Sequence, residues 1–275
     1  MVLSRAAVEL FADESLTGRI ALRGGTSLHK LFLHPPHRYS EGFEDEAALM
    51  LVEYGREHGV VTAPPIPIDD IIEEHLKIAI ELRDLRAEYP EGDVLGAIYF
   101  NDKLIVVDQS LVPEDFPSMR GRYRFTLAHE LGHRRLHRHL YLRRKNQRSL
   151  LPVTADRPDH VLRAHQSDPK EAQANRFAAC LLMPREMVKR AWHEWRGGMD
   201  PIYLDDLKAR RREILTAEVL RRGGFKSGED AEDIMLLEHA ARPLADTFQV
   251  SPESMRYRLV DMKLLVYKKE PSLFE

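Results

Sequence analysis

The segment RYRFTLAHELGHRRLHRHL, residues 122–140, constrains this chain more than any other, because it holds the pattern His-Glu-Leu-Gly-His at 129–133. An α-helix turns about once every 3.6 residues, so side chains four positions apart lie on one face. His129 and His133 can therefore bind one ion, and the neighbouring Glu130 can reach a water molecule on that ion without binding it. The alternative is a basic helix with two ordinary histidines.

A catalytic zinc ion has three protein ligands and one open position, so a third ligand is expected elsewhere. His137 continues the four-residue spacing, but it lies about 6 Å further along a straight helix, too far to share one ion easily. Cys180 lies in an apolar run, where a free cysteine is usually a small core residue. Glu171 is the best candidate. It begins the predicted helix EAQANRFAACLLMP, and Asn175 follows one turn later on the same face, where it can hydrogen-bond the site.

If such a metal site cleaves peptides, it also requires a hydrogen-bond donor for the oxyanion that forms on the scissile carbonyl. Tyr123, His137 or a residue of the segment 142–170 could supply it, and the sequence does not choose among them. Because this segment contains three prolines and no clean periodicity, it is predicted to be a long loop. His160, within it, is expected to face solvent or to contact the ligands without binding the metal.

The remaining patterns predict an α+β chain. Residues 34–46 read as a loop, 45–58 as a helix, and a short helix runs from Asp69 or Asp70 to about His75. A strand follows in KIAIELRDL, and the run 96–111 has the two apolar stretches and the Asn-Asp turn of a β-hairpin. Helices are expected over 120–140, 171–184 and most of the C-terminal region, which ends in a helix–turn–helix pattern with Ser251 as N-cap.

Composition limits the class of protein. The single cysteine excludes an intramolecular disulfide framework and fits a reducing compartment. No run of 18 or more apolar residues predicts a membrane span, and the first 25 residues lack the apolar core of a signal peptide. The formal net charge of −3 argues against a general polyanion binder. A cytoplasmic protein without membrane contact is therefore expected.

The paired motifs RFTLAHELGH and EAQANRFAACLLMP resemble the ImmA/IrrE family of bacterial metallopeptidases, and the similarity covers about residues 45–190. The resemblance implies a thermolysin-like zincin core with a small sheet, and zinc bound by His129, His133 and Glu171. It also implies that Glu130 is the catalytic carboxylate. Members of this family cleave DNA-binding repressors of the helix-turn-helix (XRE-like) type, which implies a role in stress-response, mobile-element or toxin–antitoxin regulation. The long basic insertion between His133 and Glu171 departs from the family pattern.

Positive charge is concentrated near the predicted site. Residues 120–148 contain ten Arg or Lys and one acid, Glu130. This stretch is either a solvated helix face or an electropositive rim that attracts an acidic peptide or a DNA-bound repressor. The C-terminal helices could read DNA with Arg256 and Arg258, but a structural or substrate-docking role is preferred. Direct nucleic-acid binding is thus possible without being favoured.

The segment IALRGGTSLHKLFLHPPHRYSE, residues 20–41, resembles a second family, the nucleotidyltransferases of AbiEii-type toxins. Gly24, Gly25 and Thr26 match that family's phosphate-binding turn. Its paired aspartates are missing, because Gly42 and Glu44 occupy their positions. Without carboxylates to hold magnesium the segment is not expected to transfer nucleotides, and it is interpreted as a remnant of a fusion.

Three parts are predicted: an N-terminal helical segment over 1–44, a zinc metallopeptidase domain over 45–198, and a helical region over 199–275. The function predicted is a zinc endopeptidase that cleaves a transcriptional repressor. Two alternatives are a non-catalytic protein that docks to a repressor or antitoxin, and a DNA-binding regulator led by the C-terminal helices.

Overall fold

The computed structural model describes residues 37–90, 94–147, 158, 160–163, 168–222 and 229–267. The chain divides into two compact units, Met1–Gly42 and Phe43–Glu275. Every helix and strand considered below belongs to the second unit, apart from the first turn and a half of α3. The N-terminal segment predicted to be helical over 1–44 lies outside the described residues as far as position 36, and so does the Gly24–Thr26 turn.

The first described helix, α3 (His37–His58), is longer than expected. The predicted helix over 45–58 is confirmed, but the predicted loop over 34–46 is wrong from His37 onward. Phe43, Ala47, Met50 and Tyr54 are all buried, and this helical spacing begins before residue 45.

A four-stranded mixed sheet forms the centre of the α+β fold, in the order β1-β3-β2-β4. The strands are β1 (Ala79–Arg83), β2 (Val94–Tyr99), β3 (Leu104–Asp108) and β4 (His160–Arg163). β1 pairs with β3 in parallel, and β2 pairs antiparallel with both β3 and β4. The predicted strand before residue 85 and the predicted hairpin are confirmed. Short helices surround the sheet: α4 (Ile68–Asp70), the π-helix η1 (Ile71–His75), α5 (Leu85–Glu88), and the 3₁₀ turns η2 (Gln109–Leu111) and η3 (Pro117–Met119).

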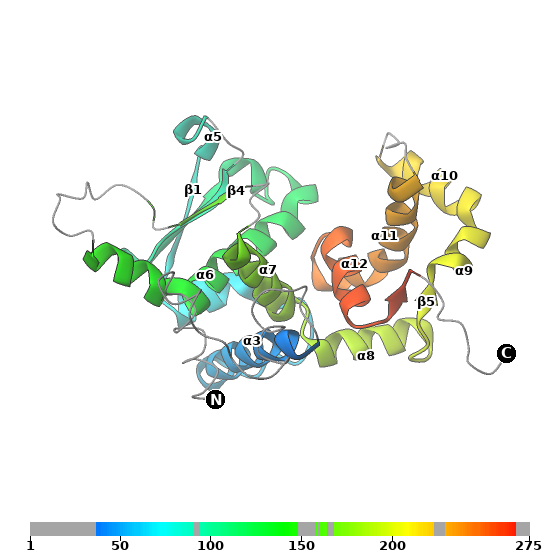
Figure 1. Ribbon diagram of the computed structural model, residues 1–275, viewed down its shortest axis with the longest axis horizontal. Helices are drawn as coiled ribbons and strands as arrows, with labels where there is room; N and C mark the ends of the chain where they lie inside the picture. Colours follow the sequence, from blue (N-terminus) through cyan, green and yellow to red (C-terminus); the bar gives the residue numbers. More distant parts are fainter. Residues whose placement is uncertain are drawn as a thin grey trace, which may run out of the picture. The chain divides into compact units, whose positions relative to one another are not determined.

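The two faces of the sheet have different partners. On one face Ala97, Tyr99 and Val106 pack with Leu85 of α5. The opposite face meets the long helix α6 (Arg120–Gln147), because a Cβ added at Gly96 would lie 2.7 Å from Cγ2 of Thr126. Both central strands are buried on both faces, which accounts for their nearly continuous apolar sequences (Figure 1).

Helix α7 (Pro169–Leu182) packs alongside α6 (Figure 1). A Cβ added at Gly132 would lie 3.1 Å from both Cα and the carbonyl oxygen of Ala174. Glycine is therefore what allows the two backbones to approach so closely. The prediction that 142–170 is one long loop is wrong in three places, because α6 continues to Gln147, β4 occupies His160–Arg163 and α7 begins at Pro169.

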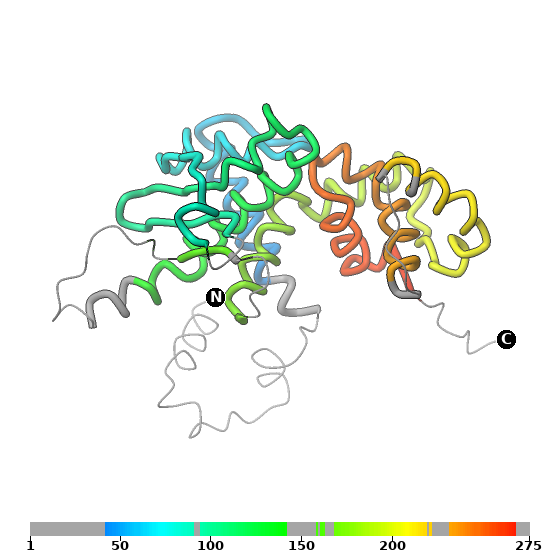
Figure 2. Tube along the Cα trace, turned by 90° about the horizontal axis from the view of Figure 1, so that it is seen from above, coloured from blue at the N-terminus to red at the C-terminus, as the bar shows by residue number. Residues whose placement is uncertain are grey.

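The C-terminal region is helical, as expected. It contains α8 (Arg185–Arg196), α9 (Leu204–Ala209), α10 (Arg211–Arg222), α11 (Glu229–Phe248) and α12 (Pro252–Asp261). A two-stranded parallel sheet joins β5 (Ile202–Tyr203) to β6 (Leu265–Val266). Figure 2 shows α11 and α12 side by side, and Ser251 caps α12 by accepting a hydrogen bond from the Ser254 amide, as predicted. Within the described ranges, no helix is both long and apolar enough to cross a membrane.

Two arginines of α12 point inward. The Arg258 side chain donates to the carbonyl oxygen of Met183 at 2.9 Å and forms an ion pair with Glu44 at 2.7 Å. The Arg256 side chain donates to the Tyr267 hydroxyl at 3.1 Å. Each of the two arginines is only 3% exposed, so in this arrangement neither presents its guanidinium to a DNA groove. Their burial agrees with the structural role preferred for the C-terminal helices.

Replacing Gly121 by alanine tests how tightly the C-terminal helices are seated. A Cβ at this position would lie 2.6 Å from the Ser251 amide nitrogen and 2.7 Å from the Val250 carbonyl carbon. Because backbone atoms cannot move aside cheaply, we expect Gly121→Ala to lower the free energy of unfolding by about 1–3 kcal/mol in urea denaturation. The control is Gly42→Ala, also in a helix, where no described atom lies within 4 Å of the added Cβ. Equal stability of the two variants would contradict this packing.

Acid stability depends on Glu218 of α10, whose carboxylate is 2% exposed and accepts hydrogen bonds from Arg221, His239 and Arg242. Burial alone would raise its pKa, but these three donors outweigh burial and lower it to about 2. The stabilisation is complete above pH 4.5, the ordinary pKa, and is lost as the pH falls towards 2. We expect Glu218→Gln to remove about 2–3 kcal/mol of stability at pH 7, and little at pH 2, in denaturation followed across pH.

The control for the Glu218→Gln variant is Glu213→Gln, on the same helix. Glu213 pairs with Arg210 at 2.9 Å, but both side chains are more than half exposed, so we expect almost no change. Identical pH profiles for the two variants would contradict a special role for the buried carboxylate.

Candidate metal centre

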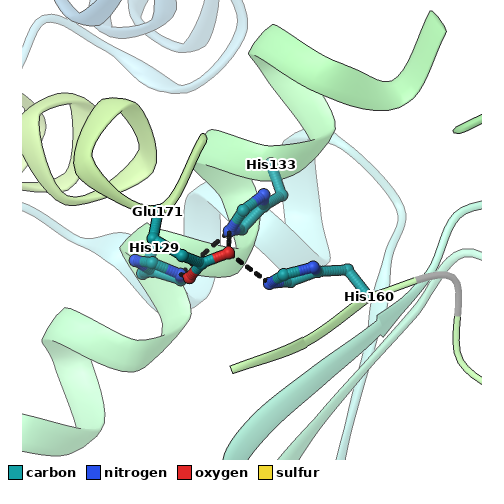
Figure 3. Close-up of side chains that lie close together, drawn as sticks. All are labelled: His129, His133, His160 and Glu171. Carbon is teal, nitrogen blue, oxygen red and sulfur yellow. Dashed lines mark hydrogen bonds and ion pairs between the residues drawn. The ribbon is translucent and has the colours of Figure 1, made fainter. Parts of the chain in front are cut away.

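Four side chains converge between α6, α7 and β4 (Figure 3). His129, His133, His160 and Glu171 each offer one ligand atom, and these atoms all lie within 4.8 Å of one another. Three of the four residues are buried and His160 is half-buried. A second such group among the described residues, Glu57, His58 and His75, has two exposed members and includes no residue of the His-Glu-Leu-Gly-His pattern. The buried group is therefore the stronger candidate for a permanent metal site.

The separations of the ligand atoms suit one ion. His129 Nε2 lies 2.9 Å from His133 Nε2 and 3.1 Å from Glu171 Oε2. Glu171 Oε1 lies 3.4 Å from His133 Nε2 and 3.0 Å from His160 Nε2. Two ligands of a tetrahedral ion with bonds of about 2.1 Å are about 3.4 Å apart. The side chains thus need only small shifts to coordinate one cation.

Each ligand is brought into place by a regular element. His129 and His133 lie one turn apart on α6. Glu171 lies in the first turn of α7, which Asp168 caps by accepting a hydrogen bond from the Lys170 amide at 2.9 Å. The close approach at Gly132 and Ala174 brings this first turn of α7 against the two histidines. The four-residue spacing of one helix and the small residues of both helices together build the site.

Hydrogen bonds behind the two histidines orient their rings. Asn175 Oδ1 lies 2.8 Å from His129 Nδ1, so this nitrogen carries the proton and Nε2 keeps its lone pair. His133 Nδ1 lies 3.1 Å from His137 Nδ1, and His137 Nε2 lies 2.9 Å from Gln173 Oε1. In this series of hydrogen bonds His137 Nε2 and His133 Nδ1 each carry a proton. His133 Nε2 is therefore left as an acceptor. Both Nε2 lone pairs therefore point into the same space as the Glu171 carboxylate.

A cation satisfies this arrangement better than protons do. Two imidazole lone pairs 2.9 Å apart repel each other unless a positive charge lies between them. Glu171 Oε1, His160 Nε2 and both Glu130 carboxylate oxygens are buried and have no hydrogen-bond partner among the described residues. Buried polar atoms of native proteins are almost always paired, so these atoms mark a place for an ion and its water. The residues present fit a bound divalent metal.

Similarity to a known protein family identifies the class of this protein. Residues 117–260, more than half of the chain, match the IrrE N-terminal-like domain described as Peptidase_M78. The chain belongs to this metallopeptidase family. A comparison with curated proteins found no match.

The family match differs in extent from the resemblance seen in the sequence. It begins at 117, later than 45, and it continues to 260, so it includes α11 and most of α12. It agrees with the α+β fold, with the long helix that carries His129 and His133, and with the metal-binding group that includes Glu171. No finding supports the AbiEii-like interpretation of residues 20–41, most of which lie outside the described residues.

Glu130 is completely buried between α6 and the sheet. A Cβ added at Gly96 of β2 would lie 3.1 Å from its Oε1, so only glycine leaves room for this carboxylate. Burial, and then the negative charge of Glu171, raise the pKa of Glu130 well above its ordinary value of 4.5. A carboxylate with a raised pKa is a stronger base, and a nearby cation would reduce this shift.

The protonation states suit metal binding as well. Burial lowers the pKa of His133 to about 3 and that of His137 to about 4, so both imidazoles are neutral at pH 7. Burial alone would raise the pKa of Glu171, but contact with His129, His133 and His160 lowers it well below its ordinary value. A neutral imidazole and an ionised carboxylate are the forms that bind metals.

The other candidates from the sequence lie in different places. The Tyr123 hydroxyl donates to Asp69 at 2.9 Å, away from the ligand group. His137 contacts the outer nitrogen of His133 and is 2% exposed. Cys180 is 4% exposed in the core, as expected for a small apolar residue.

His160 was not predicted as a potential ligand. The one hint in the sequence is the short apolar pair Val161-Leu162 beside it, which is weak evidence for a strand.

Replacing Asn175 tests the orientation of His129. Asn175→Leu removes the acceptor for the His129 Nδ1–H, so we expect divalent-metal affinity to fall by roughly 10–100-fold in competition with a chelating dye. Asn175→Asp is the matched control, because it keeps an acceptor oxygen in a side chain of the same size. Loss of affinity in both variants alike would mean that packing, and not this hydrogen bond, holds the ring.

Proposed function

We propose that the protein is a cytoplasmic zinc endopeptidase in which Glu130 is the general base. The observation that carries this proposal is the convergence of two imidazoles and a carboxylate, with a second, unpartnered carboxylate buried beside them. That arrangement supplies both a metal site and a base. Membership of a metallopeptidase family supports the same chemistry.

The donor set favours zinc. Imidazole nitrogens with one carboxylate suit zinc better than magnesium or calcium, which prefer oxygen ligands. His129, His133 and Glu171 would hold the ion. When bound, zinc supplies a Lewis acid that polarises a carbonyl group and lowers the pKa of a coordinated water molecule to around 7.

The protein side chains then move the protons. Glu130 accepts a proton from the attacking water and later passes it to the leaving amine of the cleaved peptide. Asn175 and His137 keep the rings of His129 and His133 in place during this exchange. Sheet and helix exclude bulk water from Glu130, which strengthens the electrostatic interactions within the site.

We propose a DNA-binding repressor of the helix-turn-helix type as the substrate, in stress-response, mobile-element or toxin–antitoxin regulation. The support is the resemblance of the paired motifs to the ImmA/IrrE family. The basic stretch of α6 gives less support than its sequence suggested, because several of its arginines have partners within the chain. Arg124 donates to the carbonyl oxygen of Ile66 at 2.6 Å, and Arg135 pairs with Glu46 and Glu53 at 3.0 Å each.

Glu130→Gln separates cleavage from mere docking. The protein is co-expressed with helix-turn-helix repressors encoded beside it, and new repressor fragments are measured by mass spectrometry. We expect the variant to reduce the cleavage rate by about 10²–10⁴-fold, because the amide cannot accept the proton. Zinc content should stay unchanged, since Glu130 is not needed as a ligand.

The matched control is Glu186→Gln on α8, where the side chain is 75% exposed and pairs with Lys189. It should cleave like the unmodified protein. Unchanged cleavage by Glu130→Gln would overturn the enzymatic role of this carboxylate. Cleavage of none of the repressors would overturn the substrate class.

A further inference from the structure

The register of the sheet directs His160 at the metal centre. Gly96 faces α6, and Ile98, two residues later on β2, faces the same way. His160 is the cross-strand partner of Ile98, so its side chain lies on that face as well. Val161, the next residue, pairs with Ala97 and packs on the opposite face. A register shift of one residue would turn His160 away from the site.

The His160 ring is held among the ligands on three sides. It stacks on the His133 ring with 3.7 Å between centroids, and its Nδ1 lies 3.1 Å from the Tyr141 hydroxyl. Its Nε2 lies 3.0 Å from Glu171 Oε1 (Figure 3). The side chain is only 8% exposed. Nothing in this environment resembles a solvated surface histidine.

Two unsatisfied atoms show what His160 contacts. His160 Nε2 and Glu171 Oε1 are close together, yet within the described part of the chain neither has a hydrogen-bond partner of good geometry. Both point into the space that His129 and His133 also face (Figure 3). A cation in that space would satisfy both atoms at once, which a proton shared between them does not.

We propose that His160 is a fourth protein ligand that closes the metal site at rest. Four protein donors make a coordination sphere typical of structural zinc, whereas catalysis needs one position open to water and substrate. This inference rests on the proposed peptidase function, and it makes the resting protein latent. His160 must leave the ion before water and a scissile carbonyl can enter.

The position of β4 makes such a departure feasible. β4 is the last strand in the order of the sheet and pairs with β2 alone, through four residue pairs with an irregularity between Val94 and Gly96. The other three ligand residues lie on α6 and α7, which pack tightly against each other. Withdrawal of His160 would therefore open the site without disturbing His129, His133 or Glu171.

Cobalt substitution of the full-length protein tests the coordination without any substrate. The visible absorption bands of bound Co²⁺ depend on the kind of its ligands as well as on their number. We expect His160→Ala to shift these bands, because water replaces one imidazole, and to lower zinc affinity by roughly 10–100-fold. Added imidazole should fill the vacated space and restore the spectrum of the unmodified protein. His193→Ala, at an exposed histidine of α8, is the control and should change nothing.

Cleavage supplies a second readout. We expect His160→Ala to cleave the repressor faster than the unmodified protein, and imidazole to slow it again. An unchanged cobalt spectrum in His160→Ala would overturn the ligand assignment, and slower cleavage would overturn the closing role. His160→Asn, which keeps a polar side chain, replaces the alanine variant if the latter does not fold. The spectrum needs no substrate, so absence of cleavage in every variant would count against the proposed function and not against the ligand assignment.

Discussion

The close approach of α6 and α7 is the constraint on which the rest of the structure depends. Where Gly132 meets Ala174, a Cβ on α6 would lie only 3.1 Å from the backbone of α7, so a larger residue would push the two helices apart. This contact places a carboxylate from one helix against two imidazoles of the other. A wider separation would leave Glu171 as a buried charge without a partner, which proteins rarely tolerate. The packing of α6 against α7 therefore also determines the geometry of the metal-binding group.

The sheet provides the other wall of the site. Gly96 leaves room for the Glu130 carboxylate, and the register of β4 places His160 opposite the two helices. Side chains from two helices and one strand thus surround a single point, each positioned by the geometry of its own element. The hydrogen bonds from Asn175 and His137 add orientation to this positioning. A bound ion would occupy the space between the unpaired buried atoms at the centre of the site.

Local patterns predicted the helical part of the site, because helical periodicity alone places His129 and His133 on one face and Asn175 one turn after Glu171. Glu171 could be proposed because it begins a strongly patterned helix. His160 could not be found this way, since a four-residue strand has little periodicity and its direction depends on pairing with β2. The same limit explains Arg256 and Arg258, whose burial is decided by Glu238, Glu44 and a carbonyl group distant in the sequence. Long-range pairing, and not local propensity, determines these side chains.

The Arg258 side chain binds Glu44, which lies 214 residues earlier in the chain, and also the Met183 carbonyl at the end of α7. A fragment that stops before α12 would leave the Glu44 carboxylate and the Met183 carbonyl without this partner, beside an uncovered Cys180. Removing one member of a buried ion pair is more costly than removing both. The peptidase helices and the C-terminal helices therefore belong to one compact unit, in which loss of α12 would expose polar atoms of the metal-binding segment.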